Sequence, residues 1–95
     1  MLRTPVRGTR LAILEWLGKP AAHFPPRHHE DVVAHGVRAE LVAAKLGVSR
    51  RAAVTHLELL ARVGLLRAVR VRRRTYCRRD EVRIAEVARM FEKDW

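Results

Sequence analysis

Residues 39–66 read AELVAAKLGVSRRAAVTHLELLARVGLL, and this stretch predicts two helices joined by a short turn. The first helix, residues 39–46, is followed by Gly47, at the position where a left-handed residue commonly ends a helix. Ser49 is a suitable N-cap for the second helix, residues 50–63. That helix turns an apolar face inward at helical spacing, formed by Ala53, Leu57 and Leu60. A helix, a turn containing glycine and a second helix are typical of a helix-turn-helix.

The outward face of the second helix carries the residues that we expect to contact DNA. A helix in the major groove reads base edges with the side chains of its first turns. Arg50 and Arg51 are expected to donate to guanine or to phosphates, two roles that one sequence does not separate. Val54 either contacts a thymine methyl or packs against the neighbouring helix, and Thr55 is a candidate donor. With the N-cap, the helix contributes five candidate DNA-binding residues: Ser49, Arg50, Arg51, Val54 and Thr55.

Residues 66–78 predict a β-hairpin directly after the helix-turn-helix, which would make a wing. In the first strand Leu66, Ala68 and Val71 are expected inside, alternating with basic residues outside. Residues 75–77 are strand formers that return as its partner. The turn near residues 72–74 has neither Gly nor Asn, the usual residues of a tight hairpin turn. The arginines expected along the DNA backbone or in the minor groove are Arg70, Arg72, Arg73 and Arg74.

Two further helices flank these elements. The run from Thr9, a candidate N-cap, to Gly18 is apolar on most sides, which indicates burial on more than one side. Asp80 is a candidate N-cap for a helix over 81–94, whose apolar stripe should bury one face. Because so short a chain buries only roughly 60–65% of its unfolded surface, these helices predict a homodimer. The expected seam is Leu11, Leu14, Ile84, Val87, Ala88, Phe91 and Trp95.

The whole chain, residues 1–95, is short enough for a single domain. Residues 1–8 show no periodicity and are expected to form an irregular arm. Residues 19–36 contain three prolines and four histidines and are expected to form a loop, with room for one helical turn at 31–35. The remaining parts are the helix-turn-helix at 39–63, the wing at 66–78 and the C-terminal helix at 81–94. The predicted fold class is mainly α with a small β-hairpin, a dimeric winged helix-turn-helix.

Charge is the dominant feature of the composition. Twenty Lys and Arg oppose ten Asp and Glu, which gives a net charge of +10, and seventeen of the cations are Arg. A GC-rich genome would explain the excess of Arg over Lys, but it would not explain the net charge. Residues 50–83 hold eleven Arg against Glu58, Asp80 and Glu81. A basic block between nearly neutral flanks is the electrostatic footprint of a polyanion such as double-stranded DNA.

Other chemistries find little support in the sequence. It has no nucleophile–base pair, Gly-rich phosphate loop or paired carboxylates at useful spacing, so we do not expect an enzyme. It has no signal-peptide pattern and no apolar run of membrane-spanning length. These features predict a cytoplasmic, nucleoid-associated protein without a membrane partner.

The histidines and the one cysteine leave alternatives open. His23, His28, His29 and His35, with Glu30 and Asp31, lack the spacing of a defined zinc site, so neither a metal nor another cofactor is predicted. Cys77 has no disulfide partner within the chain. It is either a small buried strand residue or, beside Arg78 and Arg79, a redox sensor of lowered pKa. His56 lies next to inward Leu57 and is expected to be satisfied within the fold.

Four groups of residues resemble the ArsR-type family of winged helix-turn-helix repressors. They are Arg10, Ile13, Leu14 and Leu17; Glu40, Leu41, Lys45 and Leu46 through Ser49; His56, Leu57, Leu60 and Gly64 through Leu66; and Tyr76. The resemblance covers roughly residues 10–92. It implies a homodimer that binds a palindromic operator and, in many members, releases it on binding a metal or another effector.

The sequence also departs from that family. Residues 37–41 have no cysteine and the helix after Asp80 has no histidine, so the metal sites do not carry over. Many members have a serine where this chain has Val54, and the long first helix is missing. The operator, the effector and the sign of regulation are left undetermined. The alternative function is a protein-interaction module that recruits a partner through its C-terminal helix, but such a module would not need a basic recognition surface.

Overall fold

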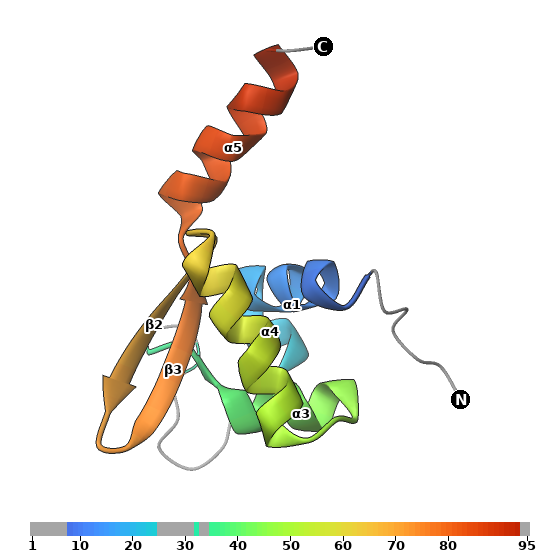
Figure 1. The fold of residues 1–95 in the computed structure, drawn as a ribbon, viewed down its shortest axis with the longest axis vertical. Coiled ribbons are helices and arrows are strands. Elements are labelled where there is room, and N and C mark those ends of the chain that lie inside the picture. Colours follow the sequence, from blue (N-terminus) through green and yellow to red (C-terminus); the bar gives the residue numbers. More distant parts are fainter. Residues whose placement is uncertain (1–7, 25–31, 33–34, 94–95) are drawn as a thin grey trace.

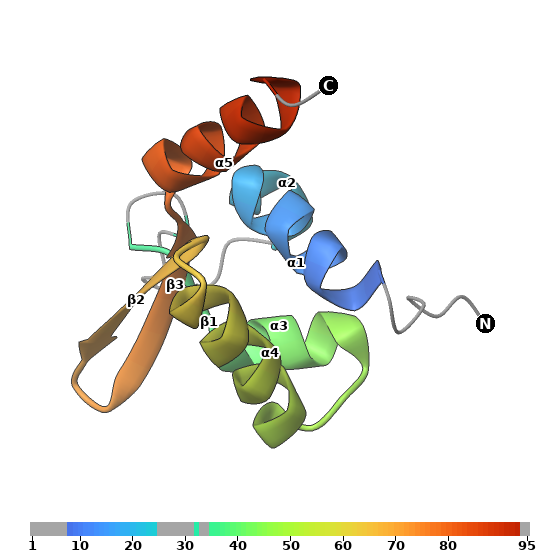
Figure 2. The ribbon, with the colours of Figure 1, turned by 45° about the horizontal axis from the view of Figure 1, so that its top comes forward.

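The computed structural model describes residues 8–24, 32 and 35–93 (Figure 1). Its elements are α1 (Thr9–Gly18), α2 (Pro20–His23), β1 (Val37–Arg38), α3 (Ala39–Leu46), α4 (Arg50–Arg62), β2 (Leu66–Val71), β3 (Arg74–Arg79) and α5 (Glu81–Lys93). Helices α1, α3 and α4 gather into one body, the β2–β3 hairpin runs along its side, and α5 leads away from it (Figures 1 and 2). The expected arm over residues 1–8, the helical turn at 31–35 and Trp95 lie wholly or largely outside the described residues.

Helices α3 and α4 are joined by local capping contacts. Gly47 ends α3 with a φ of 73°, and the N–H groups of Gly47 and Val48 donate to the Ala43 carbonyl at 2.9 and 3.0 Å. This left-handed backbone conformation costs little free energy only for glycine. The Ser49 Oγ accepts from the Ala52 N–H at 3.1 Å and caps α4. These are local interactions between residues at most five apart, and the sequence pattern identified their positions.

The core lies between α1, α3, α4 and the part of the sheet where Val37, Leu66 and Cys77 are buried. Its buried apolar side chains are Ile13, Leu17, Phe24, Val32, Val37, Ala39, Val42, Ala43, Ala53, Leu57, Leu60, Leu66 and Cys77. The inward face predicted for α4 is therefore confirmed. The N-cap predicted for α1 is wrong, because Gly8 holds that position and Thr9 is a buried residue of the first turn.

The sheet has three antiparallel strands in the order β1–β3–β2. The third strand, β1, was not predicted, because two residues are too few to show a periodicity. Val37 of β1 pairs with Cys77 of β3. Gly36 precedes it with a φ of 97°, and a Cβ there would lie 2.7 Å from the Cys77 carbonyl oxygen. Only glycine therefore lets the chain approach β3 so closely.

Two other details of the prediction are wrong. Residues 20–23 form helix α2, although a loop was expected throughout 19–36; Pro20 starts this turn because its fixed φ suits the first helical position. In β2 only Leu66 is buried, while Ala68 and Val71 are exposed. The hairpin runs along the side of the helical body (Figure 1), and every residue of β2 after Leu66 is exposed. The mainly helical fold with a small antiparallel sheet, a winged helix-turn-helix, is confirmed.

Candidate nucleic-acid interface

The outward face of α4 presents the polar residues that the sequence placed there. Arg50, Arg51 and Thr55 are exposed, as is the capping residue Ser49. Val54 is half-buried and packs against the core, so only part of its side chain faces outward. The two arginines stand at the N-terminal end of α4, where backbone N–H groups without helical partners add to the positive potential.

Arg50 forms an ion pair that joins the two helices of the motif. Its Nε donates to Glu40 Oε2 at 3.0 Å, and both side chains are about half exposed. The pKa of Glu40 is lowered, first by a hydrogen bond from its own backbone N–H and then by the side chain and charge of Arg50, against the effect of burial. A guanidinium has five N–H donors, so four remain to Arg50 for DNA. The sequence did not suggest Glu40 as a partner, because ten residues and a turn separate the pair.

The two hydroxyls beside these arginines have local roles. Thr55 Oγ1 donates to the Arg51 carbonyl at 3.1 Å, so its hydrogen is already engaged within the helix. Ser49 Oγ accepts from the Ala52 N–H, which leaves its own hydrogen available to a phosphate. The Arg51 side chain makes no hydrogen bond or ion pair with the part of the chain that the structure describes.

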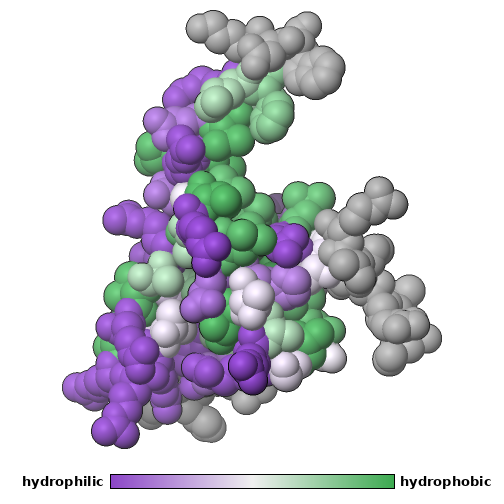
Figure 3. All heavy atoms as spheres, viewed as in Figure 1, coloured by the Kyte–Doolittle hydropathy of each residue, from purple (hydrophilic) through white to green (hydrophobic). Residues whose placement is uncertain are grey.

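The wing adds a second basic surface next to α4. Arg70, Arg72, Arg73 and Arg74 are all exposed, and none pairs with a carboxylate among residues 8–24, 32 and 35–93. Figure 3 shows hydrophilic residues gathered at the free end of the hairpin. Arg79, at the base of the wing, has a structural role: its Nη1 donates to the Leu14 carbonyl at 3.1 Å and its Nε lies 3.0 Å from Glu81 Oε2.

The tip of the wing is built from two strained arginines. The register pairs Val71 with Arg74, which leaves Arg72 and Arg73 as a two-residue turn with φ of 50° and 70°. Such a turn normally takes Asn and Gly, because the left-handed region costs other residues roughly 1–2 kcal/mol each. The positive φ values also explain how a tight hairpin forms without the turn signal that the sequence lacked. Strained backbone of this kind tends to persist where the side chains serve a function.

Replacing the tip residues should therefore raise stability. We expect Arg72→Asn combined with Arg73→Gly to increase the free energy of unfolding by about 1 kcal/mol, because relief of strain exceeds the entropy cost of the added glycine. The thermal midpoint, followed by circular dichroism, should rise by roughly 4–8 °C. Arg70→Asn removes a charge without relieving strain and should not raise it. An unchanged or lower thermal midpoint in the double variant would show that the backbone at Arg72 and Arg73 is not strained.

Cys77 and the described histidines are the remaining candidates for reactive or metal-binding chemistry. Burial raises the pKa of the Cys77 thiol to about 11, so the alternative of a low-pKa redox sensor is wrong. Among the described residues, no three His, Cys, Asp or Glu side chains are placed to hold a metal ion; His28 and His29 lie outside them. The buried Nδ1 of His56 has no hydrogen-bond partner within the described part, contrary to the expectation that this residue is satisfied.

The residues expected at a dimer seam are only partly covered by their own chain. Leu14 packs against the core, whereas Leu11 is exposed. On α5, Ile84 and Val87 are half-buried and Ala88 and Phe91 are exposed. The stripe on α5 is thus not buried within one chain. None of the helices in the described ranges is long and apolar enough to cross a membrane.

Comparison with known proteins supports a role in transcription. The chain is 38% identical over 80 residues to YbzH of Bacillus subtilis (strain 168), described as an uncharacterized HTH-type transcriptional regulator; the match covers 84% of this chain and 80% of that protein. No family model matches the chain, and no solved structure matches it significantly.

Proposed function

The chain belongs to the HTH-type transcriptional regulators, which bind DNA, and from this premise we propose that it is an ArsR-like repressor that binds a palindromic operator as a homodimer. The observation that carries the proposal is the pair of exposed basic surfaces, one at the start of α4 and one at the tip of the wing. On them Arg51, Arg72 and Arg73 make no ion pair with described carboxylates. Arginines without internal partners are available to phosphates and base edges.

We assign different roles to the two parts of this surface. The first turn of α4 reads base edges, with Arg51 as the principal donor, Arg50 held in place by Glu40, and Val54 beside them. Ser49 contributes a hydroxyl donor, whereas Thr55, whose hydrogen is engaged by the Arg51 carbonyl, contributes only an acceptor oxygen. The wing arginines 70, 72, 73 and 74 contact the backbone. This division follows the usual geometry of the motif, in which the second helix enters the major groove and flanking elements lie on phosphates.

Substitutions should distinguish the residues that read base edges from those that position the protein on the DNA backbone. Arg51→Ala or Val54→Ser should change which bases are preferred, at a cost on the order of 1–3 kcal/mol at one position of each half-site. Arg72→Ala and Arg73→Ala should weaken binding to all sequences alike. The measurement is a matrix of affinities for an operator selected from random DNA, its single-mismatch versions and a random duplex at constant salt.

Arg89→Ala on α5 is the control for that matrix, since it removes an exposed arginine away from both basic surfaces. Its affinities should stay close to those of the parent chain. If the wing variants altered base preference and the α4 variants scaled every affinity equally, the wing would be the reader, through arginine in the minor groove. The assignment of roles would then be wrong.

A second candidate function is recruitment of a partner protein through α5. Its supporting observation is the apolar surface of that helix, on which Phe91 is 63% exposed. A homodimer would cover this surface with a second copy of the chain. The oligomeric state in solution therefore distinguishes the two uses of α5.

A further inference from the structure

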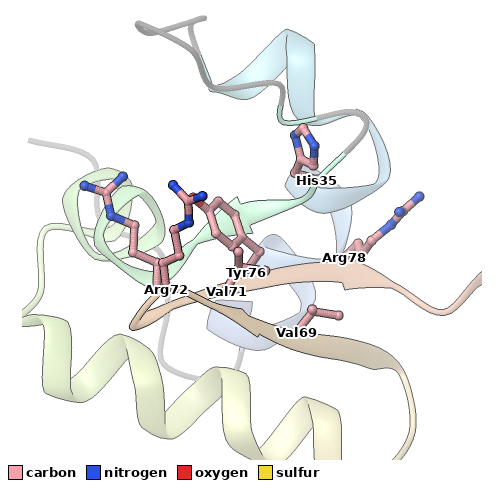
Figure 4. Close-up of a pocket in the computed structure, with 7 residues that line it drawn as sticks. His35, Val69, Val71, Arg72, Tyr76 and Arg78 are labelled. Carbon is pink, nitrogen blue, oxygen red and sulfur yellow. The ribbon is translucent and has the colours of Figure 1, made fainter.

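The outer face of the wing holds an apolar hollow that DNA binding does not require. Val69 and Val71 of β2 are about half exposed, and Tyr76 of β3 lies between them and His35 (Figure 4). Together with three arginines they line a space of about 790 Å³. This volume is within the range of about 300–1,000 Å³ that is typical of small-molecule sites. Exposed valines on a strand otherwise rich in arginine therefore suggest that a ligand covers them.

The described polar groups around the hollow are positively charged or neutral. Arg74 pairs with Val71 at the wing tip, next to Arg72, and Arg78 lies farther along β3; no carboxylate is among the described residues that line the hollow. Arg74 and Arg78 are four positions apart on one extended strand, or roughly 13 Å. An apolar floor beside Arg72 and Arg74 is complementary to a molecule with an apolar body and a negative group.

We propose that this hollow binds a small organic anion, a carboxylate or sulfonate whose aromatic body packs on Val69, Val71 and Tyr76. Phosphates of DNA would pair with Arg72 and Arg74 but would leave the valines in water, so the apolar floor favours an organic ligand over the duplex. Burial of two half-exposed valines and one face of a tyrosine supplies affinity that a bare inorganic anion lacks.

Such a ligand would also regulate DNA binding. Arg72 and Arg74 face the hollow and belong to the proposed DNA surface, so ligand and DNA compete for the same charges. Competition at shared residues is reciprocal: the ligand lowers the affinity for DNA by the factor by which DNA lowers the affinity for the ligand. This second step rests on the proposed function, whereas binding of the anion does not.

The first test uses 1-anilinonaphthalene-8-sulfonate, an aromatic sulfonate whose fluorescence rises in apolar sites, without DNA. Val69→Ser combined with Val71→Ser should weaken its binding about tenfold, since the floor of the hollow becomes polar at two positions. Val63→Ser is the matched control, because Val63 is 49% exposed at the end of α4, and it should leave binding unchanged. Sodium benzoate should displace the probe, and inorganic phosphate at equal ionic strength should not.

Three results would overturn the site. In the first, the double variant and the parent chain bind the probe equally. In the second, Phe91→Asp loses probe binding and the double variant keeps it. In the third, phosphate displaces the probe as effectively as benzoate does. The first two would place the probe elsewhere, on α5 in the second case. The third would make the hollow a simple anion site.

The second test adds the selected operator. Duplex DNA should displace the probe from the parent chain. Saturating benzoate should lower the affinity for DNA by the factor by which saturating DNA lowers the affinity for benzoate. If the double variant fails to bind the probe while the parent chain binds no DNA, the anion site stands and the proposed function fails. If the parent chain binds DNA and the probe simultaneously without mutual effect, the regulatory step is overturned although the proposed function stands.

Discussion

Raising the monovalent salt concentration from about 50 to about 200 mM should weaken DNA binding by roughly 10³-fold. The reason is counterion release: each phosphate that an arginine neutralises contributes a slope of roughly −0.9 to the plot of log affinity against log salt. If each subunit of a dimer makes about three phosphate contacts through its wing and α4, the slope is about −5. The chain has a net charge of +10, and residues 50–83, with eleven Arg against three acidic residues, contribute +8 of it, which supports contacts of this number.

Fluorescence anisotropy of a labelled operator at five or more salt concentrations measures the slope. Light scattering at each concentration controls for any effect of salt on assembly. Arg72→Ala and Arg73→Ala should each flatten the slope by about one for every phosphate that is no longer neutralised, and Arg89→Ala should leave it unchanged. A slope near −1 for the parent chain would mean that the arginine block is not the binding surface.

Phe91→Asp should split the proposed dimer and, with it, abolish high-affinity operator binding. Phe91 is 63% exposed within its own chain, so the change leaves the fold of one chain intact. In a seam, the introduced carboxylate would be buried without a partner, at a cost of several kcal/mol, or roughly 100-fold or more in the dimer dissociation constant. Light scattering should show the mass falling from twice 10.9 kDa to 10.9 kDa. Ile84→Asp should have the same effect.

Val82→Asp is the matched control for this experiment. Val82 lies on α5 and is 73% exposed, but at about 100° per residue it stands on the opposite side of the helix from the stripe of Ile84 and Phe91. This variant should remain dimeric and should bind the operator. A parent chain that is monomeric at tens of micromolar would overturn the dimer and favour recruitment of a partner protein through α5.

The helix-turn-helix was predictable because its signals are local. Gly47, Ser49 and Asp80 act on backbone groups within a few residues of themselves, and the structure places all three at the helix ends where their side chains or conformations suit them. The expected inward face of α4 follows from helical spacing alone. The wing was harder to predict, because Arg72 and Arg73 adopt a turn that their residue types disfavour. The alternation expected in β2 failed since burial there depends on which element covers the strand.

The sequence by itself therefore determined the order of the four longer helices, the residues that cap α3, α4 and α5, the basic block and the apolar stripe of α5, all of which follow from neighbours along the chain and from composition. Only the tertiary structure decided the third strand, the Glu40–Arg50 ion pair, the high pKa of Cys77 and the hollow lined by Val69, Tyr76 and His35. Each of these depends on residues brought together from separate elements or on burial by them. Such interactions are set by how the elements pack, and no periodicity along the chain records them.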